Sequence, residues 1–203
     1  MRETFYAKYG KRLFDLLVAI PLFLVIWPFM ALIALIIRVT SPGRALFIQE
    51  RLGRNAKVFR AYKYRTMTDK PRVFDTEFYT GDPSEITAIG RFLRRSKLDE
   101  LPQILNVMKG EMSLVGPRPQ LEVQLKDFND DAKLRLLVRP GLTGMAQTHG
   151  NVALSWPERW HYDAEYVRRL SFGLDLWLIV RTFAVLFLGE ERFTRKPVTA
   201  VKP

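Results

Sequence analysis

The longest apolar stretch of the chain runs from Leu16 to Ile37 and contains no charged residue. As an α-helix, its roughly 22 residues would measure about 33 Å, which is enough to cross the hydrocarbon core of a bilayer. The pattern therefore predicts a membrane helix near the N-terminus.

Basic residues flank this stretch at both ends, since Lys11 and Arg12 precede it and Arg38 follows it. Cytoplasmic segments next to membrane helices are rich in Lys and Arg, so both ends are expected on the cytoplasmic side. Pro28 lies near the middle, where it removes a backbone donor and favours a break. We therefore predict a re-entrant helix-break-helix in residues 1–40, with Pro28 at the break. A single kinked span is the alternative.

Shorter patterns follow the turn at residues 41–43. Two short strands are predicted, Ala45–Leu52 and Val58–Thr66, joined as a β-hairpin around Gly53-Arg54-Asn55. Residues 68–85 are polar and contain prolines, so a loop is expected there. Apolar residues at helical spacing then predict a helix over Ile86–Met108.

Helical spacing also dominates the C-terminal half of the chain. It predicts a charged amphipathic helix over Leu121–Val138 and another helix over Trp156–Arg169, with a glycine-rich loop over Arg139–Gly150 between them.

The last segment, Leu170–Leu188, is strongly apolar but contains Asp175 and Arg181. Charges near the centre of a spanning helix are costly, and on a helical wheel these two residues share one sector with Thr182. We therefore expect a helix that lies in the membrane interface. An ordinary core helix is the alternative.

Together these elements predict an α+β fold that is mainly helical, with a re-entrant membrane helix, a small β-hairpin and interfacial amphipathic helices. The expected division is a membrane hairpin (1–40), a cytoplasmic catalytic domain lying on the membrane (41–190) and a tail (191–203).

Charge and composition narrow the possible functions. The chain has 203 residues, with 32 Lys and Arg against 21 Asp and Glu, so its net charge is +11. An anionic partner is expected: a nucleic acid, a membrane surface or a phosphorylated substrate. The absence of cysteine excludes disulfides, thiol nucleophiles and Cys-zinc sites, and two histidines, His149 and His161, are too few for a His-rich metal site.

The strongest candidate for chemistry is the carboxylate pair Asp99-Glu100, which lies between basic residues and Pro102. Proline is favoured in the first turn of a helix, so the pair is expected at a helix N-terminus, where the helix dipole and Arg94 would lower the carboxylate pKa values. Such carboxylates suit magnesium binding or attack on phosphorus. The alternative is a capping box, in which Ser96 and Asp99 only satisfy backbone donors.

Two further segments carry weaker signals. In Gly116-Pro117-Arg118-Pro119, two prolines hold one arginine on a stiff turn, which suits phosphate recognition, although a plain proline turn is the alternative. In Arg139–Gly150, glycines would allow a ligand to approach the backbone closely.

These segments occur together in a recognisable order. They include Tyr62-Lys-Tyr-Arg-Thr-Met67, Ser96-Lys-Leu-Asp-Glu-Leu-Pro-Gln103, Leu105-Asn-Val-Met-Lys-Gly-Glu-Met-Ser113, Val115-Gly-Pro-Arg-Pro119 and Arg139-Pro-Gly-Leu-Thr-Gly144. From about Lys11 to Leu188, the chain resembles the bacterial sugar transferase family, in its minimal form of a monotopic polyprenyl-phosphate phosphoglycosyl transferase.

The resemblance implies a reaction and a set of roles. The family transfers a sugar-1-phosphate from a UDP-sugar to undecaprenyl phosphate and releases UMP, as the first membrane step in the assembly of polysaccharides or glycoproteins. It implies that Asp99 is the nucleophile, forming a phosphosugar-aspartyl intermediate, and that Asp99 and Glu100 hold Mg²⁺. The implied substrate-binding residues are Lys63, Arg65, Arg94, Arg118, Arg139 and Gln147.

The resemblance also implies a place in the cell, which is the cytoplasmic face of the bacterial inner membrane. Membrane lipid is the expected partner besides the substrates, nucleic acid is not, and an oligomer is compatible with the pattern. Two positions depart from the family: Trp27 precedes Pro28 where many relatives have serine, and His149-Gly150-Asn151 replaces an arginine-containing segment.

The competing hypothesis is a non-catalytic, membrane-attached basic scaffold that binds anionic lipid or nucleic acid. It gives no reason for the carboxylates at residues 99 and 100.

Overall fold

The computed structural model describes residues 4–68 and 83–193 of the chain. These residues form a mainly helical fold with two small sheets, which confirms the expected α+β class. The α-helices are α1 (Lys11–Thr40), α2 (Ala88–Arg95), α3 (Ile104–Lys109), α4 (Asp130–Leu134), α5 (Met145–Thr148), α6 (Trp156–Arg169) and α7 (Phe172–Leu188). The strands are β1 (Leu46–Leu52), β2 (Val58–Tyr64), β3 (Ser113–Val115) and β4 (Gly141–Thr143).

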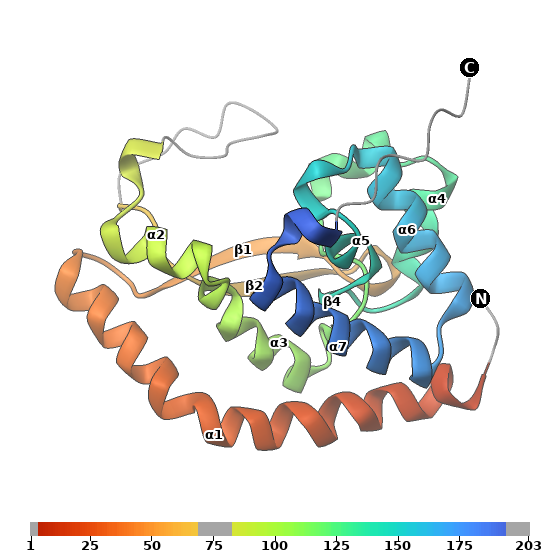
Figure 1. The fold of residues 1–203 in the computed structure, drawn as a ribbon, viewed down its shortest axis with the longest axis horizontal. Helices are drawn as coiled ribbons and strands as arrows, with labels where there is room; N and C mark the ends of the chain where they lie inside the picture. Colours follow the sequence, from red (N-terminus) through yellow and green to blue (C-terminus); the bar gives the residue numbers. More distant parts are fainter. Residues whose placement is uncertain (1–3, 69–82, 194–203) are drawn as a thin grey trace.

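Helix α1 runs along one edge of the molecule and bends in its middle, the part that contains Pro28 (Figure 1). Its backbone stays helical through both Pro21 and Pro28, so the expected break is a bend within one continuous helix of 30 residues. A proline inside a helix removes one hydrogen bond and crowds the preceding turn, which accounts for a bend. The concave side of α1 faces the rest of the protein, and its convex side faces away (Figure 1).

The outer surface of α1 is apolar and exposed. Leu24, Val25 and Val39 are 63%, 76% and 79% exposed. By length and composition, the helix from Tyr6 to Thr40 is suited to crossing a membrane, and little of its apolar window is buried inside the protein. Soluble proteins rarely expose so much contiguous apolar surface, so α1 is a candidate membrane-binding element.

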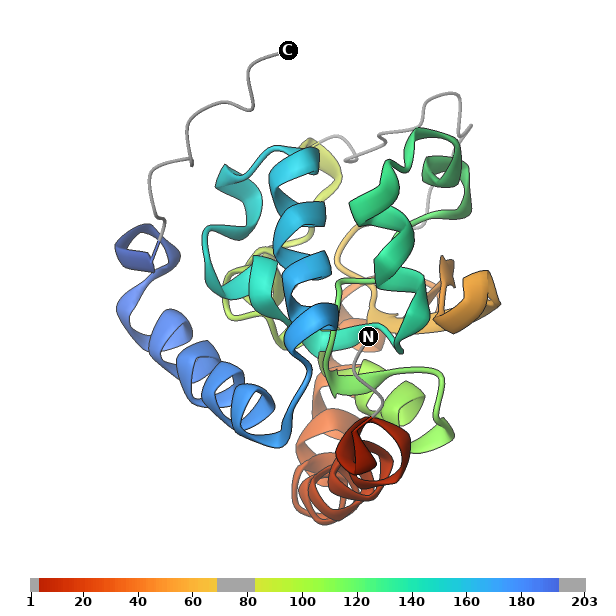
Figure 2. The ribbon, with the colours of Figure 1, turned by 90° about the vertical axis from the view of Figure 1, so that its right-hand side faces the viewer.

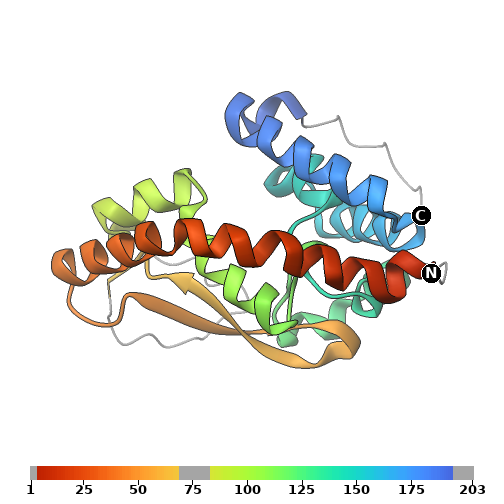
Figure 3. The same ribbon diagram turned by 90° about the horizontal axis from the view of Figure 1, so that it is seen from below.

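Helix α7 begins beside the first turns of α1, where Phe172 packs on Phe14, and then diverges from it (Figures 2 and 3). It presents a second apolar surface. Its polar residues point inward: Asp175 is fully buried, the Arg181 guanidinium donates to the Thr148 carbonyl at 3.0 Å, and Thr182 contacts Thr143 at 2.6 Å. Leu178 and Val185 are buried with these polar residues, while the opposite face of the helix is apolar and exposed, including Phe187 at 84% exposure. An exposed apolar face agrees with a helix that lies on a membrane.

Buried polar contacts join α1 to the core. Lys11 forms a 2.6 Å ion pair with Asp175, which also accepts hydrogen bonds from the hydroxyls of Tyr6 and Tyr166. One turn further along α1, the carboxylate of Asp15 accepts from the Ser113 hydroxyl and the Leu114 amide. The basic residues before the apolar stretch therefore make specific contacts, Lys11 to α7 and Arg12 to the Val107 and Met108 carbonyls of α3, while Asp15 binds β3.

The predicted hairpin is confirmed, since β1 and β2 pair in antiparallel register with Leu46 opposite Tyr64 and Leu52 opposite Val58. The tight connection contains Asn55 with a φ of 57°, a left-handed conformation that asparagine tolerates better than most residues. Part of the loop expected at 68–85 and most of the expected tail fall on residues 69–82 and 194–203, outside the described residues.

Two predicted long helices are divided in the structure. The prediction over Ile86–Met108 is wrong at its centre, because α2 ends before Ser96 and the chain turns at Lys97, whose φ is 58°. The prediction over Leu121–Val138 is wrong in a similar way: two 3₁₀ turns flank α4, which begins after a cap in which Asn129 accepts from the Ala132 amide.

The expected loop over Arg139–Gly150 contains strand β4 and helix α5. Strand β4 pairs in parallel with β3, and three glycines allow the crossing. A Cβ on Gly141 would lie 2.1 Å from the Gly116 amide nitrogen, and one on Gly144 would lie 2.2 Å from the Gly116 carbonyl oxygen. These glycines therefore serve close packing of backbone on backbone, and the interpretation of them as an open ligand loop is replaced.

Candidate active site

The carboxylate pair Asp99-Glu100 lies in the first turn of a 3₁₀ helix, Leu98–Gln103, that leads into α3. This confirms the expected position at the start of a helix. Ser96 does not form the alternative capping box, because its hydroxyl donates to carbonyls at the end of α2. The left-handed turn at Lys97 thus separates α2 from a new helix that begins with the two carboxylates.

Glu100 is the centre of a cluster of charges. Lys63 on β2 donates to its Oε1 at 2.8 Å, and Arg118 binds both of its oxygens, at 2.5 and 3.1 Å. The Glu100 side chain is only 19% exposed. The two cations hold the pKa of Glu100 well below its usual range, although burial acts in the opposite direction.

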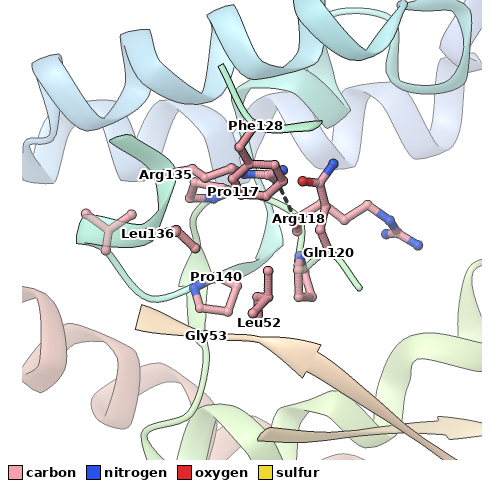
Figure 4. Close-up of a pocket in the computed structure, with 11 residues that line it drawn as sticks. Leu52, Gly53, Pro117, Arg118, Gln120, Phe128, Arg135, Leu136 and Pro140 are labelled. Atoms are coloured by element: carbon pink, nitrogen blue, oxygen red, sulfur yellow. Dashed lines mark hydrogen bonds between the residues drawn. The ribbon is translucent and has the colours of Figure 1, made fainter. Parts of the chain in front are cut away.

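Arg118 is held in place by its backbone. It lies between Pro117 and Pro119, and the guanidinium of buried Arg135 donates to its carbonyl oxygen at 2.6 Å (Figure 4). Its own side chain is 46% exposed and extends from this fixed backbone to Glu100. A stiff backbone with a half-exposed guanidinium suits recognition of a phosphate.

Asp99 differs from its neighbour. Burial and the adjacent charge of Glu100 raise the pKa of Asp99, while Lys63, Arg118 and Arg94 act in the opposite direction. The expectation of a lowered pKa is therefore correct in direction for Glu100, where Arg118 and Lys63 are the cause and not the helix or Arg94, and it is wrong for Asp99. The cause is that Asp99 is partly desolvated and, among the residues that the structure describes, has no charged hydrogen-bond donor of the kind that Glu100 has.

Arg94 approaches the pair from the last turn of α2. Its Nε donates to the Thr66 hydroxyl at 2.8 Å, and its charge acts on Asp99. Three of the predicted substrate-binding residues, Lys63, Arg94 and Arg118, are thus brought together around the carboxylates.

The other three predicted binding residues lie elsewhere. Arg65 is buried and donates to the carbonyl oxygens of Ser41 and Pro42, which fixes the turn after α1. Arg139 donates to the Gly110 carbonyl at the end of α3. Gln147 on α5 donates to the Leu142 carbonyl. None of these hydrogen bonds involves Asp99 or Glu100.

Sequence reasoning missed Arg51 on β1. Burial and the charge of Arg118 lower the pKa of Arg51 to about 10, and Glu100 acts in the opposite direction, so Arg51 belongs to the same cluster. Its guanidinium donates to the Pro119 carbonyl at 3.3 Å. The register of the predicted hairpin could have identified Arg51, because every second residue from Phe47 to Arg51 lies on the sheet face that carries Lys63.

The departure at His149 has a structural role. The ring is buried, its Nδ1 lies 2.7 Å from the Met145 carbonyl oxygen, and it stacks on Tyr162 with centroids 5.0 Å apart. This histidine packs α5 against α6.

Among the described residues, the carboxylates of this site that would hold a metal are Asp99 and Glu100. Among residues 4–68 and 83–193, no cluster of three or more acidic or histidine side chains has the arrangement of a metal site. Mg²⁺ is commonly bound through one or two carboxylates together with substrate phosphates and water, so the pair fits that ion when a phosphorylated substrate is present.

Comparison with known proteins is consistent with this arrangement. The family model of the bacterial sugar transferases matches residues 6–189. A Bacillus subtilis protein named as an uncharacterized sugar transferase, EpsL, is 38% identical over 190 residues, covering 94% of this chain and 93% of its own length. The exopolysaccharide production protein ExoY of Rhizobium meliloti is 34% identical over 196 residues, covering 89% of this chain and 87% of its own.

A longer relative is named by its reaction. The UDP-glucose:undecaprenyl-phosphate glucose-1-phosphate transferase of Xanthomonas campestris is 38% identical over 199 residues, which cover 92% of this chain but 40% of the relative. The chain thus spans nearly all of its short relatives and less than half of this longer one. With the family model matched over almost the whole chain, the protein belongs to the bacterial sugar transferase family and is a transferase enzyme.

Proposed function

We propose that this protein transfers a sugar-1-phosphate from a UDP-sugar to undecaprenyl phosphate through a covalent intermediate on Asp99, as the first membrane step of glycoconjugate assembly. The observation that carries the proposal is the carboxylate pair surrounded by Lys63, Arg94 and Arg118 at the start of one helix. A relative with 38% identity is named for transfer of glucose-1-phosphate to undecaprenyl phosphate, which supports the same class of reaction.

The first step uses Asp99 as the nucleophile. One of its carboxylate oxygens attacks the phosphorus that bears the sugar, and the bond from that phosphorus to the UMP oxygen breaks. UMP leaves with the electron pair of that bond, and the sugar phosphate remains on Asp99 as an acyl phosphate. In the second step, an oxygen of undecaprenyl phosphate attacks the same phosphorus, which frees the carboxylate and forms the polyprenyl diphosphate sugar.

The cations stabilise the charge that moves during both steps. Arg118 is the more exposed of the two cations on Glu100, and it is placed to bind the donor diphosphate. Arg94 approaches from the other helix and neutralises the phosphoryl group near Asp99. Asp99 and Glu100 would also hold Mg²⁺, which supplies charge neutralisation of the phosphates when bound.

The covalent route explains how one site serves two unlike substrates. A soluble nucleotide sugar and a lipid phosphate need not be present together if Asp99 stores the sugar phosphate between them. The product keeps a diphosphate linkage like that of the donor, so little driving force is lost in the exchange.

The proposed location is the cytoplasmic face of the inner membrane, with α1 as a re-entrant helix. Its support is the bend of α1, with the concave side toward the protein, together with basic residues at both ends (Figure 1).

Because the chain lacks cysteine, the topology can be tested with Lys8→Cys and Pro42→Cys, two exposed positions on either side of α1. A membrane-impermeant maleimide should label neither in intact spheroplasts and both after permeabilisation. Labelling of Lys8→Cys in intact spheroplasts would identify a through-span.

The reaction is tested with a panel of labelled UDP-sugars. Incubation with the correct donor alone should leave label on the wild-type chain and release UMP, and undecaprenyl phosphate should then remove the label. Asp99→Asn should fold and insert but acquire no label. Retention of even a tenth of the wild-type rate in Asp99→Asn would refute the nucleophile assignment. If none of the UDP-sugars in the panel yields UMP, the result would favour a non-catalytic scaffold.

A further inference from the structure

A groove opens where α1 ends and β1 begins, and none of the residues that line it is a hydrogen-bond partner of the carboxylate pair. It has a volume of about 720 Å³, which lies within the range of small-molecule sites. Three arginines and three apolar residues contribute to its lining: Arg38, Arg44, Arg65, Leu46, Phe47 and Ile48.

The lining has two kinds of surface. Arg38 and Arg44 are exposed, so both guanidinium groups lie in solvent at the groove. Leu46, Phe47 and Ile48 are 39%, 37% and 46% exposed, which is unusual for three consecutive large apolar residues in a strand. A ligand that pairs an anion with a hydrocarbon chain complements both surfaces.

The position of the groove points to a lipid. Arg38 lies in the last turn of α1, next to Val39, which is 79% exposed and continues the outer apolar surface of the helix. The groove therefore begins where the candidate membrane surface of α1 ends, so with α1 in a bilayer it would face the headgroup phosphates.

The hairpin connects this groove to the carboxylates. Phe47 is directly opposite Lys63 in the register of β1 and β2, and the side chains of such a pair lie on the same face of the sheet. Lys63 in turn donates to Glu100 at 2.8 Å. Arg65 is two residues beyond Lys63, a step of about 7 Å along a strand.

We propose that this groove binds the phosphate and the first isoprenoid units of the polyprenyl phosphate acceptor before the acceptor reaches Asp99. The inference rests on the proposed function, since it assigns a place to the second substrate. A phosphate monoester carries between one and two negative charges at neutral pH, whereas the phosphodiester of an ordinary phospholipid carries one. A cluster of arginines therefore favours the monoester. Because Phe47 in the groove lies opposite Lys63 on β2, a phosphate bound in the groove has a short path along the sheet to the carboxylates.

The first test measures binding without catalysis. A photoreactive benzoyl-phenylalanine at position 47 is irradiated in vesicles that contain either undecaprenyl phosphate or phosphatidylglycerol at equal negative charge, and the adducts are identified by mass. We expect an adduct with undecaprenyl phosphate that is at least tenfold more abundant than that with phosphatidylglycerol. Equal adducts, or none, would overturn the proposal and leave the groove as a general contact with anionic lipid or solvent.

The second test separates the two half-reactions. In the double variant Arg38→Gln/Arg44→Gln, labelling of the chain from the UDP-sugar should proceed at the wild-type rate, while the apparent KM for undecaprenyl phosphate in removing the label should rise at least tenfold. Lys133→Gln is the matched control, because Lys133 is an exposed cation on α4, remote from the end of α1 (Figure 1). It should change neither half-reaction.

These results distinguish the groove from the proposed function. An unchanged KM for the acceptor in the double variant would refute the groove, even with normal labelling. Equal loss of labelling and label removal would assign the two arginines to general membrane attachment. If wild-type protein acquires no label, the covalent mechanism fails, and the photocrosslinking result still decides the groove.

Discussion

The ion pair between Lys11 and Asp175 gives a quantitative test of how α1 is attached to the catalytic body. The Lys11 Nζ lies 2.6 Å from the Asp175 Oδ2, and the two side chains are 9% and 0% exposed. Asp175 also accepts hydrogen bonds from the hydroxyls of Tyr6 and Tyr166, at 2.6 and 2.8 Å. The perturbations are Lys11→Met, Asp175→Asn and the double variant.

The burial of the pair sets the size of the effect. Removing one partner of a buried ion pair leaves an uncompensated charge and costs about 3–5 kcal/mol. Lys11→Met should be at the lower end, because the two tyrosines still donate to Asp175. Asp175→Asn should be at the upper end, because the Lys11 ammonium then loses the anion at 2.6 Å and keeps only the charge of Asp15, to which it makes no ion pair. The double variant leaves neither member of the pair charged, so its loss should be about 3 kcal/mol smaller than the sum of the single losses.

Thermal unfolding in detergent or nanodiscs, followed by tryptophan fluorescence, measures these losses. For a chain of this length, about 3 kcal/mol corresponds to a fall in Tm of roughly 6–12 °C. The exposed pair Lys133–Asp130 is the control: its atoms are 3.1 Å apart, but its side chains are 65% and 100% exposed, so Lys133→Met should shift Tm by no more than about 2 °C. Single variants at the buried pair that match this control, or losses that add in the double variant, would refute the reasoning.

Three other predictions test packing, titration and metal dependence. Gly90→Ala should lower the free energy of unfolding by about 3 kcal/mol or more, because its Cβ would lie 2.0 Å from the Thr66 carbonyl oxygen. The Cβ of Gly173→Ala meets nothing within 4 Å, so this control should raise the free energy of unfolding by up to about 1 kcal/mol. Both changes are measured as shifts in Tm, and equal shifts would contradict the packing. Because burial and Glu100 raise the pKa of Asp99, the rate of labelling should fall on the acid side at a pH above the usual aspartate range. Lys63→Met removes a charge that lowers this pKa, so it should move the acid limb of the pH profile to higher pH. An acid limb that does not move in Lys63→Met would contradict the role of Asp99 as the titrating group. EDTA should stop turnover and Mg²⁺ restore it in the wild type but not in Glu100→Gln, and full activity in EDTA would remove the metal from the mechanism.

The regular elements with long-range periodicity could be predicted from the sequence. Helix α6 has the predicted bounds, Trp156–Arg169, because its apolar positions repeat at helical spacing and Ser155 with Glu158 forms a capping box at its start. The hairpin β1–β2 was also predictable from alternation and turn residues. The predictions were wrong where one residue interrupts a pattern of apolar positions that continues past it. Lys97 does so by its left-handed backbone, and Asn129 does so by capping the start of α4.

The candidate site shows the same limit. The pair Asp99-Glu100 and the stiff turn at Arg118 stand out in the sequence, but their contact does not, because 18 positions separate Glu100 from Arg118. Nor could the sequence separate the two carboxylates. Their opposite pKa shifts arise because Lys63 and Arg118 both donate to Glu100, which leaves Asp99 partly buried beside a negative charge.

Two carboxylates on the apolar helices, Asp15 directly before the apolar stretch of α1 and Asp175 within α7, have one explanation in the structure. Asp15 and Asp175 would be costly in hydrocarbon, yet both are fully buried inside the protein and accept hydrogen bonds from other elements. Each carboxylate therefore fixes the inner face of an otherwise apolar helix, and the outer faces of α1 and α7 are left to contact lipid. Since Asp15 binds the Ser113 hydroxyl and the Leu114 amide of β3, and Arg118 follows β3 along the chain, these buried contacts also determine where the site stands relative to α1. The residues that disfavour simple spanning helices are thus those that join the membrane-facing helices to the catalytic body.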